Sequence, residues 1–132
     1  MEQQSAQAQC QELVDSFVAD LEMFATGSYL AEDETDLWDQ PFDPSAIPHI
    51  QTALTNFLDA VDALARSHPS LPQEDVRELA ATTIQELESI NAEFAYAVLE
   101  PEEFDEVNAI LIAAFQVAGA DEDSIEQLPI LE

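Results

Sequence analysis

The sequence contains no lysine and only two arginines, Arg66 and Arg77, against 29 aspartates and glutamates among its 132 residues. The formal net charge at pH 7 is therefore −27. Proteins bind nucleic-acid phosphates largely by exchanging condensed counterions for lysine and arginine, so this composition excludes direct binding to DNA or RNA. Anionic membrane surfaces would also repel such a protein.

Cysteine and glycine are nearly absent as well. Cys10 is the only cysteine, which excludes an intramolecular disulfide and any zinc site built from cysteine pairs, and we expect it to be a small core residue. The only two glycines, Gly27 and Gly119, cannot form a glycine-rich phosphate-binding loop, and each is expected to end a helix. No stretch approaches the ~18 apolar residues of a transmembrane span, and the amino terminus lacks the basic and apolar regions of a signal peptide. We therefore expect a cytoplasmic protein without metal or other cofactor.

Catalytic groups are scarce. His49 and His68 are the only histidines, and they are predicted near opposite ends of one helix, about 28 Å apart by helical rise. They cannot share a site within one chain, so we expect them to be surface or capping residues. Close pairs of carboxylates arise by density alone in this sequence and do not indicate acid–base catalysis. We therefore expect that the protein is not an enzyme.

Apolar residues recur at helical spacing through most of the chain, and no segment shows the sustained alternation of a β-strand. This pattern predicts an all-α protein with a single domain over residues 1–132. The predicted helices cover residues 5–26, 45–67, 72–99 and 101–118. The short connections at 68–71 and 99–101 favour antiparallel neighbours, so the expected architecture is a four-helix antiparallel bundle.

Local patterns refine these helices. Ser45 is expected to cap the second helix, and Ser70 the third, with Gln73 completing a capping box. The first helix is predicted to bury one apolar stripe, formed by Leu13, Val14, Phe17, Val18, Leu21 and Phe24.

Each arginine has an acidic residue one helical turn before it. Asp62 precedes Arg66 by four residues, and Glu74 precedes Arg77 by three. These spacings favour local ion pairs, which would leave neither arginine free to bind an anion.

The connection over residues 28–44, SYLAEDETDLWDQPFDP, is long and alternates acidic residues with aromatic ones such as Trp38 and Phe42. Most loops in compact domains have about 4–6 residues, and longer ones are often functional. Two interpretations remain open: the aromatics fold back on the end of the bundle, or they anchor a basic partner. The tail, residues 120–132, is expected either to dock as a short turn or to stay mobile.

The charge favours a binding function over catalysis. One hypothesis is an acidic DNA mimic that inhibits a nucleic-acid-binding protein, because carboxylates four residues apart on a helix are ~6 Å apart along its axis, similar to neighbouring phosphates. The acids expected to form this surface are Glu12, Asp15, Glu22, Glu74, Glu78 and Glu88. A second hypothesis is an immunity- or chaperone-like module that binds one basic protein through residues 28–44. A third assigns the charge to salt adaptation or solubility in a housekeeping protein.

The excess of negative charge predicts that added salt stabilises the fold. The carboxylates repel one another in the compact state, and screening shortens that repulsion to about 10 Å at ~0.1 M ionic strength. Thermal melts followed by circular dichroism should therefore move to higher temperature from low to moderate NaCl. A melting temperature that does not respond to salt would mean that the carboxylates are too widely spread to repel.

Overall fold

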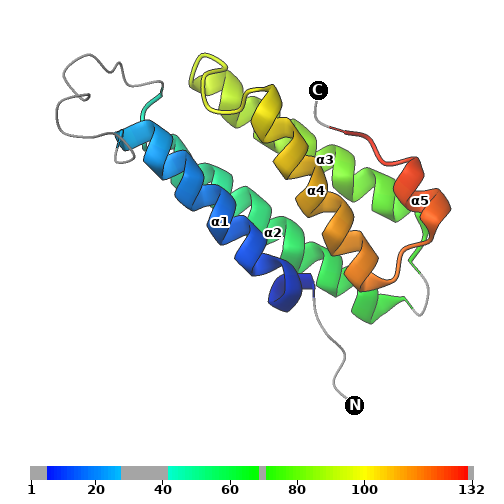
Figure 1. Cartoon of the computed structure of the whole chain (residues 1–132). Coiled ribbons are helices and arrows are strands. Elements are labelled where there is room, and N and C mark those ends of the chain that lie inside the picture. The colour runs from blue at the N-terminus through cyan, green and yellow to red at the C-terminus, as the bar shows by residue number, and fades with distance from the viewer. Residues whose placement is uncertain (1–5, 28–41, 69–70, 131–132) are drawn as a thin grey trace.

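The computed structural model describes residues 6–27, 42–68 and 71–130. These residues form α-helices and no β-strand, which confirms for this part of the chain the all-α prediction. The helices are α1 (Ala6–Thr26), α2 (Ala46–Ser67), α3 (Gln73–Glu93), α4 (Pro101–Ala118) and the short α5 (Glu122–Glu126). The four long helices lie side by side, and successive ones run in opposite directions (Figure 1).

The second helix, α2, packs against all the other long helices. It contacts α1, α3 and α4; in addition α1 packs on α4, and α5 contacts both α3 and α4. Apolar side chains from these helices form one core, in which Phe57 and Phe115 are the largest of the fully buried residues. Their rings meet edge to face with centroids 5.4 Å apart and planes at 81°, an arrangement worth about 0.5–1.5 kcal/mol beyond the area that it buries. The packing of α4 on α2 thus includes the two largest of the fully buried side chains.

The apolar stripe of α1 is buried only in part. Val14 and Leu21 are fully buried, as predicted. Leu13 and Phe24, which were predicted for the same face, are instead 46% and 41% exposed. The prediction was wrong for these two residues because the stripe is wider than the contacts of α1 with α2 and α4, so its edges reach the surface.

The amino-terminal end of α1 is capped by a residue of another helix. Asp62, which is buried on α2, accepts hydrogen bonds from the backbone N–H groups of Ala6 (2.6 Å) and Gln7 (3.1 Å). The first turn of α1 has no acidic residue of its own, so this carboxylate satisfies two free donors and faces the positive end of the helix dipole. Asp62 was predicted to pair with Arg66, but among the described residues the two charged groups do not approach within 4.0 Å. The hydrogen bonds of Asp62 go to α1 instead.

The end of α3 differs most from the prediction. The side chain of Asn91 turns the chain back: its Oδ1 accepts hydrogen bonds from the N–H groups of Val98 (3.1 Å) and Leu99 (3.0 Å), and its Nδ2 donates to the Leu99 carbonyl (3.0 Å). Ala95 and Tyr96 both have a φ of 61°, a left-handed conformation that cannot continue a right-handed helix. Val98 and Leu99 are nevertheless buried. The apolar spacing thus continues beyond the helix, which explains the wrong boundary at residue 99.

Two helix starts also differ from their predicted caps. Ser45 directly precedes α2, but its side chain makes no capping hydrogen bond. Its N–H donates instead to Oδ1 of Asp43 at 2.9 Å, which forms a turn before the helix. Ser70 lies outside the described residues, and a proline without a capping side chain precedes α3. The side-chain amide of Gln73 donates to Oε1 of Gln127 at 2.6 Å.

The two glycines end helices as predicted. Gly27 follows α1 with a φ of 70°, and Gly119 follows α4 with a φ of 91°. This left-handed region favours glycine at the end of a helix. Beyond Gly119 the short helix α5 packs against α3 and α4, and Leu128 after it is buried. Of the two alternatives predicted for the tail, these residues match the docked turn. Nη2 of Arg77 donates to Oε1 of Gln127 at 2.9 Å and ties the tail to α3.

Asp62→Ala is expected to lower the free energy of unfolding by about 1–3 kcal/mol, because it leaves the buried N–H of Ala6 and the partly buried N–H of Gln7 without this acceptor. Asp62→Asn keeps an acceptor oxygen and should cost less. Asp59→Ala removes the same charge from an exposed position of α2 and should stay within about 0.5 kcal/mol of the parent. Urea denaturation of the three variants checks this order, and equal effects of Asp62→Ala and Asp59→Ala would contradict the capping role.

Candidate functional site

The six acidic side chains predicted to form a binding surface are all exposed. Three lie on α1, namely Glu12, Asp15 and Glu22 (the α1 acids), and three lie on α3, namely Glu74, Glu78 and Glu88 (the α3 acids). In Figure 1, α4 runs between α1 and α3. Since α1 packs against α2 and α4, whereas α3 packs against α2 and α5, the two sets of acids stand on helices that are not main packing partners.

Few positive groups neutralise these carboxylates. Within the described residues, one acid and one base approach to 4.0 Å, Oδ2 of Asp75 and Nε2 of His68, and the histidine is charged only when protonated. Nδ1 of His68 also lies 3.1 Å from the Leu64 carbonyl at the end of α2, a capping contact of the kind predicted. Arg77 bonds to Gln127 in place of its predicted acidic neighbour. The acidic surface of this part of the chain is thus left almost without internal counter-charge.

Of the two aromatic anchors predicted between the first helices, Phe42 lies within the described residues. It is 7% exposed and belongs to the core, so it can reach a partner only by leaving its packed position. For this residue the structure matches the interpretation in which the aromatics fold back on the helices. Trp38 lies outside the described residues, and its role stays a prediction.

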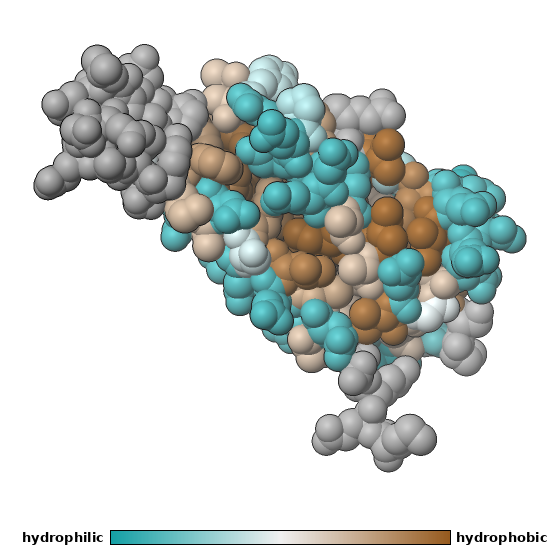
Figure 2. All heavy atoms as spheres, viewed as in Figure 1, coloured by the Kyte–Doolittle hydropathy of each residue, from teal (hydrophilic) through white to brown (hydrophobic). Residues whose placement is uncertain are grey.

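A hollow of about 190 Å³, the α1–α4 groove, lies between the two helices for which it is named. Its floor contains Phe17 of α1 and Ile110 of α4, each only 3% exposed, and Leu13 stands beside them with 46% of its surface exposed. Figure 2 shows apolar side chains, in brown, on this face of the molecule between hydrophilic ones in teal. The sequence pattern does not reveal this groove, because its two sides come from helices far apart in the chain.

Two carboxylates flank this apolar floor, Asp20 from α1 and Glu106 from α4. Partial burial raises the pKa of the Glu106 carboxyl above its ordinary value, and the negative charges of Asp20 and Glu102 raise it further. No described basic side chain lies within 4.0 Å of either flanking acid. The groove therefore combines an apolar floor with like charges that lack a cation.

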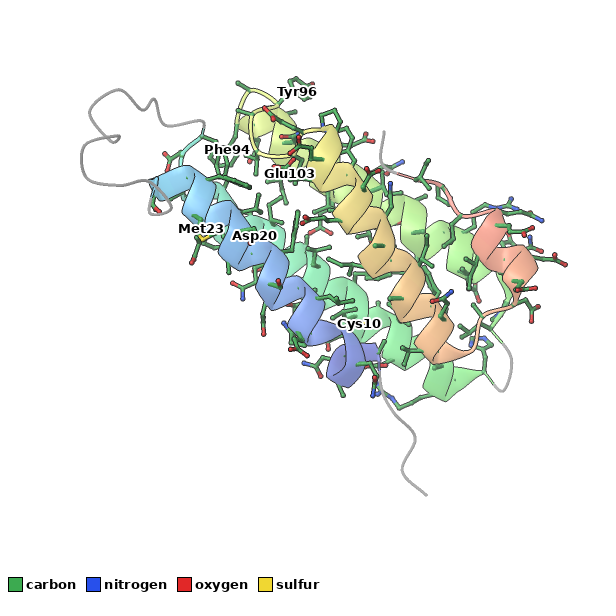
Figure 3. All side chains as sticks on the ribbon, in the orientation of Figure 1. Cys10, Asp20, Met23, Phe94, Tyr96 and Glu103 are labelled. Carbon is green, nitrogen blue, oxygen red and sulfur yellow. The ribbon has the colours of Figure 1, made fainter. Side chains whose placement is uncertain are left out.

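Another carboxyl with a raised pKa lies at the start of α4. Figure 3 places Glu103 at the same end of the molecule as Phe94 and Tyr96, which belong to the turn after α3. Burial raises the pKa of Glu103, hydrogen bonds from the N–H groups of Glu103 and Glu100 oppose this, and the charges of Glu100 and Glu102 add to the rise. Its Oε2 atom is buried without a hydrogen-bond partner among the described residues.

A second hollow, of about 280 Å³, lies between α2 and α3 and is lined by Leu64, Leu79, Asp75 and Glu78. It resembles the α1–α4 groove in combining apolar and acidic side chains. Here, however, Asp75 faces the imidazole of His68, a group that can become cationic. In the α1–α4 groove, by contrast, the charge of Asp20 acts on Glu106 and no described basic side chain lies within 4.0 Å of either acid. A cation from a partner would therefore be stabilised more strongly in the α1–α4 groove.

The described residues offer no other obvious chemistry. In ranges 6–27, 42–68 and 71–130, no three His, Cys, Asp or Glu side chains are grouped so that they could hold a metal ion. None of the helices in these ranges has the length and apolar character needed to cross a membrane. Cys10 is 1% exposed, and burial together with the nearby carboxylate of Asp62 raises the pKa of its thiol. The thiol is therefore protonated at neutral pH and packs as a core residue, as predicted.

Comparison with protein-family models, with curated proteins and with solved structures gives no match for this chain.

The raised pKa values of Glu103 and Glu106 predict that the fold gains stability as the pH falls from 7 toward their ordinary value of 4.5. In that window the folded state binds more protons than the unfolded state, so stability rises with proton concentration. Asp43, whose pKa is lowered by its hydrogen bonds with Ser45, has the opposite effect, but only at pH values below its ordinary 3.8.

Glu106→Gln tests this directly. It removes a charge that repels Asp20 and Glu102, so the melting temperature at pH 7 should rise, and its change between pH 7 and 5 should shrink. Glu88→Gln, which removes one exposed charge from α3, serves as the control and should leave most of the pH dependence intact. A pH dependence that is the same in both variants would assign the effect to overall charge.

Proposed function

We propose that this protein is a non-enzymatic binding module, built as a four-helix bundle, for a basic protein partner. One observation carries the proposal: the α1 acids and the α3 acids are exposed and have no cationic neighbour within 4.0 Å among the described residues. Lysine and arginine side chains of a partner would supply the missing positive charge. The long-range attraction would speed encounter and select against acidic partners.

A nucleic-acid-binding protein is one such partner, and this protein would then act as a mimic that inhibits it. Two features favour an interface that is partly apolar over a purely phosphate-like one. The acids proposed for mimicry stand on two separate helices, and Leu13 is exposed close to carboxylates of α1 and α4. Apolar contacts would then contribute most of the binding free energy, and the charges would contribute rate and specificity.

The test is capture of a basic protein by the immobilised full chain from a lysate of its native host. Retained proteins are identified by mass spectrometry at about 50 mM and about 500 mM NaCl, because screening at the higher concentration should release partners held by charge. Changing all three α1 acids, or all three α3 acids, to their amides removes three charges in each case. Gln and Glu have similar helix propensities, so the glutamate changes leave the helices intact.

The variants separate specific binding from general attraction. If one partner is held by a defined surface, one triple variant should lose it while the other retains it. Trp38→Ala tests the alternative anchor between the first two helices, where loss of a buried aromatic contact would cost about 2 kcal/mol or more. Added DNA or RNA should compete if the partner is a nucleic-acid-binding protein. Failure to retain any basic protein at low salt would refute the proposal and assign the charge to solubility or salt adaptation.

A further inference from the structure

We propose that the α1–α4 groove is the docking site for a basic amphipathic helix of the partner protein. This inference rests on the proposed function and names the surface and the kind of segment that binds there. It is carried by the size of the groove, its apolar floor and the two carboxylates that flank it.

The size of the groove fits one large apolar side chain. Its volume is about 190 Å³, and an apolar cavity of about 150 Å³ is known to accommodate a benzene ring. Sites for drug-sized ligands are larger, about 300–1,000 Å³. A single leucine, isoleucine or phenylalanine of the partner would therefore rest on Phe17 and Ile110 and against the exposed side of Leu13.

The two flanking carboxylates favour a basic side chain next to the apolar one. Asp20 lines the groove from one helix and Glu106 from the other. Partial burial raises the pKa of Glu106, and the negative charges of Asp20 and Glu102 raise it further. A lysine or arginine placed at this edge would interact with both carboxylates and relieve their repulsion. On a helix, residues three or four positions apart lie on one face about 5–6 Å apart. A helix with an apolar residue and a basic residue one turn apart can therefore place the first on the apolar floor and the second beside Asp20 and Glu106.

Charge also decides between this occupant and others. A second copy of the chain would bring another charge of −27 against the same face, and nucleic acid would bring phosphates against Asp20 and Glu106. A helix that lies along the line where α1 and α4 meet can pack against both of them. The insertion of apolar anchors at helical spacing into such a groove is a common mode of peptide recognition.

The probe is a fluorescent amphipathic peptide of leucine and lysine, about 18 residues long because shorter isolated helices are marginal in water. A peptide of the same composition with its sequence scrambled, so that the apolar face is lost, is the control. Fluorescence anisotropy at low salt measures the affinity of each for the full chain. The amphipathic peptide should bind more tightly.

Two pairs of variants then locate the site. Asp20→Asn with Glu106→Gln should weaken binding of the amphipathic peptide about tenfold. Glu86→Gln with Glu93→Gln, which removes the same charge from exposed positions of α3 outside both acidic sets, should change it by no more than about twofold. Ala109→Phe fills the groove without altering charge, since Ala109 lines it and is exposed. It should weaken binding by a similar factor.

Controls keep the outcomes distinct. Ala63→Phe, at an exposed position of α2, should not affect binding. The Asp20→Asn, Glu106→Gln variant loses repulsion and should melt no lower than the parent, so its weaker binding cannot come from unfolding. If both charge pairs weaken binding equally, if the scrambled peptide binds as well, or if the chain self-associates through this face in sedimentation, the groove proposal is wrong while the proposed function stands. If neither peptide binds at low salt, both fall.

Discussion

Helix packing in this protein depends on apolar contacts, because the chain has too few cations to hold its helices together with ion pairs. With two arginines against 29 acids, each helix brings negative charge toward its neighbours, and the repulsion grows as the chain becomes compact. Burial of apolar surface, at roughly 25 cal/mol per Å², must outweigh this effect. The core accordingly joins all the long helices around α2, and the ring contact between Phe57 and Phe115 joins α2 to α4 within it.

Where a polar contact does fix the structure, it is directed at the backbone or at a neutral group. Asp62 holds the start of α1 through two N–H groups, and Asn91 holds the turn after α3 through three hydrogen bonds to Val98 and Leu99. Gln127 accepts hydrogen bonds from the side chains of α3 that fix the tail. Backbone N–H groups are donors that every residue except proline supplies, so a chain without lysine still has partners for its buried acids and amides.

This reliance on apolar spacing explains how far the sequence alone could be interpreted. The helices and their caps at Gly27 and Gly119 follow from local periodicity and glycine geometry, which are encoded within a few residues. The end of α3 and the cap of α1 could not be predicted, because Asn91 and Asp62 act across larger separations in the chain. Val98 illustrates the difficulty: it is buried, at helical spacing from the stripe of α3, yet lies outside the helix.

The candidate site was only partly predictable, for the same reason. Exposure of the predicted helix-face acids follows from amphipathic patterning, but the position of Asp20 opposite Glu106 depends on how α1 packs against α4. That placement matters because a uniformly acidic surface attracts any cation and selects among basic partners poorly. An apolar floor between two uncompensated carboxylates is more selective, since a partner must present an apolar and a basic side chain together. Repulsion between these two acids lowers the stability of the free protein. A lysine or arginine of the right partner would relieve that repulsion on binding. The same pair of carboxylates would thus destabilise the free fold and favour the partner that we propose.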